Sequence, residues 1–285
     1  HLDIYGYPID GQDGYLSPEQ MQRYRELMSE GYAALGMPGY ELKQESDHTN
    51  DLTSRYAERL RYLELSLDFA QMELDMSKGI NGWQLTDVAD RFVRDCHHFG
   101  IENLMEMGVT VDEYRAQVDN YLRKCSRPSL ATNHPVTLTH EPDKQYYAGG
   151  AKGLTDGIAG IMNYKQCWLG FFGDTLDAVV DLWGQRPVQQ ISIDFYFFPL
   201  SWIFLPEKVE FYISDDRRLW SKVSESKPTN PEILATPRIE TITSGLFKRN
   251  ARYVRIIAYP LPEIPSWHRA TGNKCWMFTD EIIVR

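Results

Sequence analysis

The sequence predicts a multidomain α plus β protein in which a helical bundle or layer precedes a β-sandwich. Amphipathic stretches at helical spacing fill the first half of the 285-residue chain, and short β-branched and aromatic runs fill the second half. The charge also changes, because residues 1–128 hold 13 Lys and Arg against 23 Asp and Glu, whereas the remainder holds 17 of each. We therefore predict a helical domain over residues 1–127 and a sandwich over residues 128–285.

The first half contains four amphipathic stretches with helix start and stop signals. A capping box at Ser17, followed by proline, opens the first, and an apolar stripe over roughly residues 51–78 marks the second. We expect Thr86 to cap the third helix and a second capping box at Thr110 to open the fourth. Short connections between such helices are typical of a bundle. Because no catalytic or metal-binding motif accompanies them, we expect this half to be a scaffold.

The second half contains six short runs that are typical of β-strands. They are rich in β-branched and aromatic residues, several alternate polar with apolar residues, and no helix-length pattern lies between them. The runs are VTLTHEP, LDAVVDLW, VQQISIDFYF, EKVEFYISDD, RYVRIIAYP and FTDEIIVR. Asp215 and Asp216 are expected in a hairpin turn. In the closing strand, the side chains of Trp276 and Phe278 are expected to face the core. Many short strands at this spacing predict a sandwich or jelly roll.

The order of the segments from near Val136 to the end resembles a known family. The segments are GLTDGIAG, WLGFFGDTLDAVVDLW, ISIDFYFFPLSWIFLPEKVEFYISDDRRLW, RYVRIIAY and WMFTDEIIVR. In this order they resemble a galactose-binding-like sandwich of the discoidin type, also called the coagulation factor 5/8 C-terminal type. The version they resemble is appended to hexosaminidase-type glycoside hydrolases of polysaccharide-degrading bacteria. The resemblance implies a jelly roll that binds a glycan or polysaccharide.

The helical half resembles the C-terminal helices of an uncharacterised, glycosidase-like barrel family that often carries this sandwich. The stretches RYAERLRYLELSLDFAQMELD and RFVRDCHHFGIENLMEMGVTVDEY carry that resemblance. It implies a non-catalytic C-terminal region of a bacterial glycoside-hydrolase-like protein, with the catalytic barrel of the parent protein as its partner. A secreted, periplasmic or cell-surface location follows from the same resemblance. The chain itself begins at His1 without Met and shows no signal peptide.

The family frequently binds calcium where its final strand meets the loop that holds the Asp-Gly turn. Carried over to this chain, the resemblance names Asp156 and Glu281 as calcium ligands, together with backbone carbonyls around residues 152–158. Calcium takes six to eight oxygens, so carbonyls and water must supply most of them. Ile158 and Ile161 stand where the family often has oxygen-bearing side chains. The alternative is that Asp156 only forms an Asx-turn with the backbone.

Sugar rings stack on exposed aromatic faces, and their hydroxyls need planar polar partners. Loops rich in both are therefore candidate binding sites, and we select residues 163–172, 198–204 and 262–274. For residues 198–204 we favour packing on the parent barrel or on the helices, because aromatic residues and proline fill this segment. The candidate sugar-binding residues are Tyr164, Trp267 and His268.

We expect no catalysis from this chain alone. A retaining glycosidase needs two carboxyls that converge on one bond. Successive strand residues point to opposite faces, which excludes Asp280 with Glu281 as such a pair. No nucleophile-elbow, P-loop or dinucleotide-binding motif occurs. The rival functions are a purely structural buttress for the catalytic barrel and a protein-adhesion module.

Composition excludes further classes. The net charge of −10 argues against nucleic-acid binding, and no apolar run has the length needed for membrane insertion. The spacing of the four cysteines matches no zinc pattern, so free thiols are favoured. A disulfide between Cys167 and Cys275 stays open, because the two lie in similar local sequences.

Overall fold

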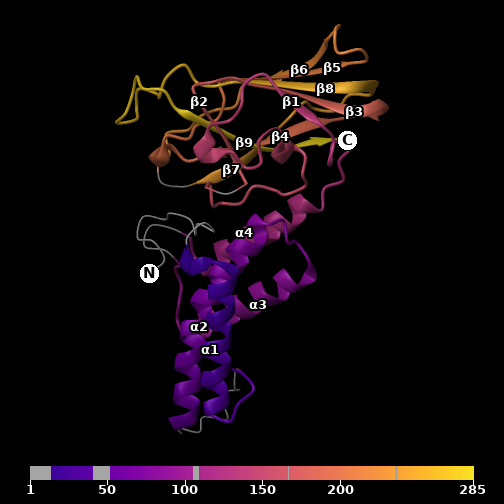
Figure 1. Cartoon of the computed structure of the whole chain (residues 1–285). Helices are drawn as coiled ribbons and strands as arrows, with labels where there is room; N and C mark the ends of the chain where they lie inside the picture. The colour runs from indigo at the N-terminus through magenta and orange to yellow at the C-terminus, as the bar shows by residue number, and fades with distance from the viewer. Residues whose placement is uncertain (1–13, 41–51, 105–108, 166, 235–236) are drawn as a thin grey trace. The chain divides into compact units, whose positions relative to one another are not determined.

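The computed structural model describes residues 14–40, 52–104, 109–165, 167–234 and 237–285. The chain divides into two compact units, His1–Leu122 and Arg123–Arg285. The first contains α-helices, in indigo and magenta in Figure 1, and the second contains the strands, most of them in orange and yellow. The predicted combination of a helical region with a β-sandwich is confirmed.

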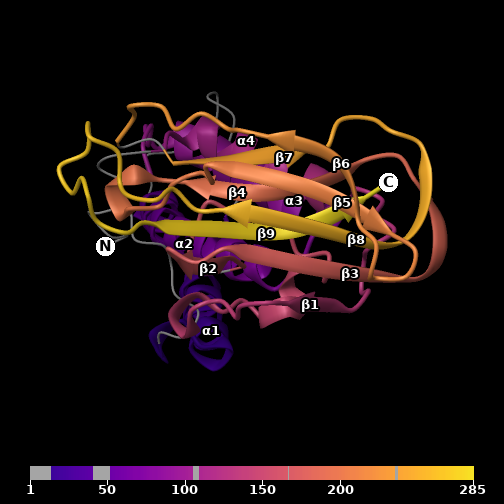
Figure 2. The same cartoon turned by 90° about the horizontal axis from the view of Figure 1, so that it is seen from above.

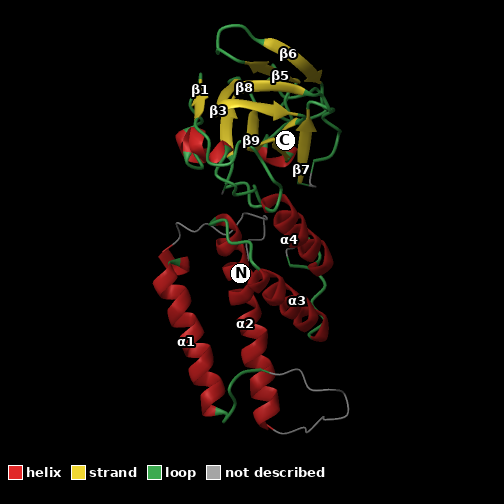
Figure 3. Cartoon of the chain, turned by 90° about the vertical axis from the view of Figure 1, so that its right-hand side faces the viewer, coloured by secondary structure: helices red, strands yellow, loops and turns green. Residues whose placement is uncertain are grey.

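The described residues before the sandwich form four α-helices, red in Figure 3. They are α1 (Pro18–Ala34), α2 (Leu52–Ser77), α3 (Trp83–His98) and α4 (Val111–Cys125), preceded by the short 3-10 helix η1 (Gly14–Leu16). Helix α2 packs against both α1 and α3. Phe69 of α2 and Tyr114 of α4 lie with their ring centroids 4.8 Å apart, and Phe92 of α3 joins them. In the described part of the chain, no helix is both long and apolar enough to cross a membrane.

Local capping chemistry sets the start of α1 and of α4. The Ser17 side chain accepts a hydrogen bond from the backbone N–H of Gln20 at 3.3 Å. The Thr110 hydroxyl accepts one from the N–H of Glu113 at 3.1 Å, and the Glu113 carboxylate accepts one in return from the N–H of Thr110 at 2.8 Å. Both helix starts are therefore confirmed.

The predicted start of the third helix is wrong. Helix α3 begins at Trp83 with Gly82 as its N-cap, so Thr86 lies inside its first turn. Burial explains the earlier start, because Leu85 is buried on the same helical face as Phe92. That face can include Leu85 only if the helix begins about one turn before the position expected from Thr86.

The second unit is a sandwich of two antiparallel sheets, visible from above in Figure 2. One sheet has the order β1-β3-β8-β5-β6, and the other has the order β2-β9-β4-β7. The strands are β1 (Val136–Leu138), β2 (Leu169–Phe172), β3 (Leu176–Val188), β4 (Ile191–Phe197), β5 (Lys208–Ser214), β6 (Ser221–Ser226), β7 (Arg238–Thr243), β8 (Arg249–Tyr259) and β9 (Trp276–Val284). The only helical turns described beyond α4 are the 3-10 turns η3 (Lys144–Tyr146), η4 (Gly150–Leu154) and η5 (Pro199–Ser201). The prediction of strands without a long helix is confirmed.

The hydrophobic core lies between the two sheets and follows the two-residue alternation of strands. Leu176, Ala178 and Val180 of β3 are fully buried in it, while the residues between them are only partly buried. Asp215 and Asp216 lie in the turn between β5 and β6, as predicted.

A second aromatic cluster covers the other face of the four-stranded sheet. In β9, Met277 enters the core between the sheets, whereas Trp276 and Phe278 belong to this second cluster. Trp168 and Tyr196 complete its buried centre. The expected alternation of Trp276 and Phe278 with Met277 is therefore confirmed, and the core that Trp276 and Phe278 face is this second cluster, whereas Met277 enters the core between the sheets.

None of the four cysteines is in a disulfide, as favoured from their spacing, so the alternative Cys167–Cys275 bond is not formed. Burial raises the pKa of the Cys275 thiol to about 11 and that of the Cys96 thiol to about 12. Neither thiol is therefore activated as a nucleophile.

Candidate functional site

The Asp-Gly turn and the last strand meet through their carboxylates. Asp156 accepts a hydrogen bond from the backbone N–H of Ile158 at 2.8 Å, which is the geometry of an Asx-turn. Glu281 accepts one from the backbone N–H of Gly157 at 2.7 Å. The structure thus brings together the two residues named as calcium ligands, and it also contains the Asx-turn of the alternative.

A β-bulge in β9 brings a third carboxylate to the same loop. Ile193 of β4 pairs with Ile282, and the next residue, Asp194, pairs with Asp280, so Glu281 is the extra residue in the ladder. Its φ of 27° is unusual for a residue with a side chain. Asp280 accepts a hydrogen bond from the backbone N–H of Gly160. The expectation that Asp280 and Glu281 serve opposite faces is wrong, because the bulge breaks the alternation.

Burial and mutual repulsion favour protonation of these carboxyls. Burial, followed by the charge of Asp156, raises the pKa of Glu281 to about 8. Burial raises the pKa of Asp280 well above its ordinary value, and the charges of Glu281 and Asp194 add to the effect. Burial also raises the pKa of Asp156, which forms a side-chain hydrogen bond with Glu281. These shifts favour retention of a proton by the Asp156 and Glu281 pair.

A site that retains a proton can exchange it for a cation. Asp156 and Glu281 are two neighbouring carboxyls of the kind that calcium takes. Among the described residues, no group of three or more His, Cys, Asp or Glu side chains is arranged to hold a metal ion. The carboxyl pair fits calcium only if backbone carbonyls and water complete the shell.

The three predicted sugar-binding residues fall in two places. Tyr164 is only 7% exposed, and its ring packs against Tyr196 and Phe278 in the second aromatic cluster. Trp267 and His268 lie together in the loop before β9, with ring centroids 5.8 Å apart. The structure therefore brings Trp267 and His268 together and places Tyr164 elsewhere.

His268 is a buried imidazole with one unused nitrogen. The ring is 2% exposed, and its Nδ1 accepts a hydrogen bond from the backbone N–H of Ala270 at 3.1 Å. Because Nδ1 accepts, the hydrogen of the neutral ring is on Nε2. That Nε2 is buried and has no hydrogen-bond partner among the described residues. The rings of Phe204 and Trp267 lie on its flanks.

The aromatic segment 198–204 folds onto the sandwich itself. Phe198 and Ile203 form a β-bridge, and the N–H of Trp276 donates to the carbonyl of Trp202 at 2.9 Å. Ile203 and Phe204 are buried in the sandwich. Part of the segment's apolar surface is thus covered within the sandwich, while Leu200 is 38% exposed, and packing of this segment on the parent barrel or on the helices stays a prediction.

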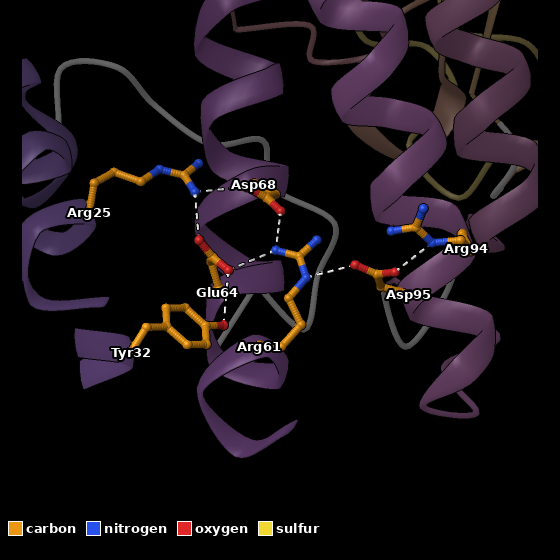
Figure 4. Close-up of polar contacts among 7 residues, drawn as sticks. All are labelled: Arg25, Tyr32, Arg61, Glu64, Asp68, Arg94 and Asp95. Atoms are coloured by element: carbon orange, nitrogen blue, oxygen red, sulfur yellow. Dashed lines mark hydrogen bonds and ion pairs between the residues drawn. The ribbon is translucent and has the colours of Figure 1, made fainter. Parts of the chain in front are cut away.

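The helical unit contains a buried ion-pair network that the sequence did not indicate (Figure 4). Arg61 of α2 donates to Asp68 and to Asp95 of α3, each at 2.7 Å. Arg25 of α1 donates to Asp68 at 2.8 Å, and Arg94 donates to Asp95 at 2.9 Å. Because arginines form ion pairs with both aspartates, the network is typical of a structural link between helices and not of a catalytic carboxylate pair.

Comparison with known proteins finds no matching family model and no matching curated protein. Among solved structures, the sandwich is similar to a chitosan-binding module of a Paenibacillus sp. IK-5 chitosanase/glucanase. That match has 16% identity and a TM-score of 0.38, and it covers 56% of this chain and 99% of the other. The Clostridium perfringens module CpGH89CBM32-6 matches with 17% identity and a TM-score of 0.34, over 55% of this chain and 98% of its own.

A third similar structure is a GH29 fucosidase of Ruminococcus gnavus in complex with fucose. It has 13% identity and a TM-score of 0.37, and the match covers 63% of this chain and 31% of the fucosidase. The two modules are thus matched over nearly their whole length, whereas the enzyme is matched over less than a third.

Proposed function

We propose that the sandwich binds a glycan at the loop that holds Trp267 and His268. The observation that carries this proposal is the Nε2–H of His268, a buried donor between two aromatic rings that has no partner in the part of the chain that the structure describes. Leaving such a donor unpaired costs about 1–3 kcal/mol, so a ligand hydroxyl or a bridging water gains that energy. Trp267 is partly exposed beside it and offers an indole face for the apolar side of a pyranose.

The chain itself has a non-catalytic role in this proposal, as part of a glycoside-hydrolase-like protein outside the cytoplasm. The sequence resemblance supports this context and names the catalytic barrel as the partner. A shallow site with one stacked ring binds weakly, with a dissociation constant on the order of 0.1–1 mM. Tethering to an enzyme raises the effective concentration, so weak binding is enough to retain the enzyme on a polymer.

Calcium is a further part of the proposal. Asp156 and Glu281 would hold the ion, with carbonyls of residues 152–158 and water in the remaining positions. Bound calcium supplies positive charge to the buried carboxyls in place of a proton. The residues of the chain then keep the Asp-Gly turn closed against β9 through the N–H of Gly157.

A structural buttress is the alternative function, and the burial of Tyr164 and His268 favours it. A glycan array probed with the whole chain separates the two. Binding to a defined set of terminal sugars supports the glycan-binding proposal. An array without any bound glycan, together with no retardation in polysaccharide gels, supports the buttress.

A further inference from the structure

Trp183 in β3 is exposed although its backbone is strained. Its φ is 59°, in the left-handed region that bulky residues rarely adopt, and 64% of its surface is exposed. It lies where the pairing of β3 with β8 shifts, between Asp181 and Arg186. A residue in this conformation carries backbone strain, and the exposed ring recovers little of that energy through burial. Glycine would take the same backbone without that cost.

One neighbour contacts the indole ring, and two more fix the backbone at this position. The backbone N–H of Trp183 donates to Asp181 Oδ1 at 2.8 Å. Arg252 of β8 holds the same carboxylate with two hydrogen bonds of 2.9 Å. The ring of His134 lies against the indole, with centroids 4.1 Å apart and planes inclined by 36°. His134 therefore supports one side of the ring, while most of the residue's surface faces solvent.

The polar groups around the ring suit a neutral, hydroxyl-rich ligand. His134 Nδ1 lies 3.0 Å from the carbonyl of Thr132 and must donate to it, so Nε2 of the neutral ring is an acceptor. The side chains of Asp181 and Arg252 are 26% and 41% exposed, and their charges cancel. This surface thus combines one aromatic face with a planar donor, a carboxylate and an imidazole. It lacks the excess positive charge that phosphate ligands need.

We propose that Trp183, His134, Asp181 and Arg252 form a second carbohydrate-binding site for one pyranosyl residue of a neutral glycan. The apolar face of the sugar stacks on the indole of Trp183. Its hydroxyls donate to Asp181 and His134 and accept from Arg252. The backbone strain at Trp183 is then the cost of presenting the ring to the ligand.

This site is separate from the loop that holds Trp267. Pairing between β3 and β8 runs from Leu176 with Ala258 to Val188 with Arg249. Trp267 follows the Ala258 end of β8, whereas Trp183 lies seven residues along β3 from Leu176. At about 3.3 Å per residue, that is roughly 20 Å along the strand. One sugar ring cannot contact both, so the inference goes beyond the proposed function and can hold without it.

Native affinity electrophoresis tests the second site, with galactan, galactomannan or mucin in the gel and the whole chain as the sample. We expect Trp183→Gly to lose the retardation that wild type shows in at least one gel, a decrease in affinity on the order of tenfold. Its melting temperature should be unchanged or higher, because glycine relieves the strain. Leu219→Ala, which truncates another exposed apolar side chain of this sheet's hairpin, should migrate like wild type.

Other outcomes decide against the second site or against the first. If Trp183→Gly is retarded like wild type in every gel, or if no gel retards wild type, the second site is overturned. If only Trp267→Ala loses retardation, the loop site stands alone, and if only Trp183→Gly does, the second site stands alone. A strongly lowered melting temperature for Trp183→Gly would show that the indole ring stabilises the fold. In that case NMR spectra of the wild-type protein decide. The indole N–H signal of Trp183 is assigned by its loss in Trp183→Phe, and the second site requires that this signal shift when methyl galactoside or methyl mannoside is added.

Discussion

The Glu281 carboxylate accepts a hydrogen bond at 2.7 Å from the backbone N–H of Gly157, which lies 124 positions earlier in the chain. This contact joins the last strand of the sandwich to the Asp-Gly turn near its beginning. Glu281 sits on a β-bulge with a φ of 27°, so its side chain reaches the turn only through an unusual backbone conformation. The closure of the sandwich is therefore sensitive to the charge on one carboxyl.

Stability of the sandwich should fall as pH rises from about 5 to about 8. Burial and Asp156 raise the pKa of Glu281 to about 8 in the folded chain, above its ordinary value of 4.5. Between these values the folded state binds a proton that the unfolded state has released, so each pH unit costs up to about 1.4 kcal/mol. The raised pKa values of Asp156 and Asp280 act in the same direction. Urea unfolding midpoints measured across this pH range test the prediction.

Glu281→Gln is the matched variant for that experiment. Glutamine keeps an oxygen that can accept from the N–H of Gly157, but it binds no proton. Between pH 5 and pH 8 the free energy of unfolding should decline less than in wild type, by the contribution of about one linked proton. The variant should be more stable than wild type only at the alkaline end of this range. An equal decline in both proteins would show that another group is responsible.

Calcium should stabilise the sandwich more at pH 8 than at pH 5. The ion needs ionised Asp156 and Glu281, so it competes with the shared proton. At ten times its dissociation constant, calcium adds about 1.4 kcal/mol to the free energy of unfolding. The measurement is the melting temperature of metal-stripped protein with millimolar calcium, with Glu281→Gln as control. If calcium gives neither a shift nor heat in titration calorimetry at pH 8, hydrogen bonds and the proton alone hold the turn.

The strands that the sequence predicted and the strands that it missed differ in their place in the sheets. The missed strands β2, β6 and β7 all lie at a sheet edge. An edge strand buries less of its surface, and β6 reads SKVSES, a polar segment without an apolar stripe. Five of the six predicted runs became strands buried on at least one face, where alternation or continuous apolar sequence is required. Hydrophobic pattern therefore identifies the centre of each sheet better than its edges.

The sites show the same dependence on long-range geometry. The pairing of Asp156 with Glu281 followed from the family resemblance, but Asp280 was missed because a β-bulge leaves no clear signal in sequence. Trp183 was assigned to an ordinary strand run, because the neighbouring sequence does not predict its left-handed backbone conformation. The Arg61 network was missed because its members lie on three helices and meet only after packing.

Arg61→Met should destabilise the helical unit by up to about 3 kcal/mol. The change leaves Asp68 with Arg25 alone and Asp95 with Arg94 alone, so two buried carboxylates lose part of the positive charge that compensates them. Loss of the far-ultraviolet circular dichroism of helices in urea reports on this unit. Arg23→Ala is the control, because Arg23 forms ion pairs on the surface of α1 and its loss should not move the midpoint measurably. Similar midpoints for both variants would contradict a structural role for the network.

Thr110→Ala should destabilise α4 by about 1 kcal/mol. The hydroxyl of Thr110 satisfies the N–H of Glu113 in a reciprocal capping box, and alanine leaves that N–H to water. Thr110→Ser keeps an oxygen in the same place and should restore most of the loss. The urea midpoint of the helical unit measures both variants, and equal midpoints for Ala and Ser would mean that the cap contributes nothing.

The loop site is tested by removing its aromatic face and its donor separately. Trp267→Ala removes the partly exposed indole beside Phe204, and His268→Phe removes the Nε2–H while it keeps a ring in the buried position. If the loop binds sugar, each variant loses retardation in polysaccharide gels, with little change in melting temperature. If Trp267 is mainly a core residue, its replacement by Ala costs about 3–5 kcal/mol instead. Ser266→Ala, a change at an exposed neighbour, should alter neither quantity. A His268→Phe variant that binds as wild type does would mean that a water, not a sugar, satisfies the histidine, and the structural buttress would then be the better account.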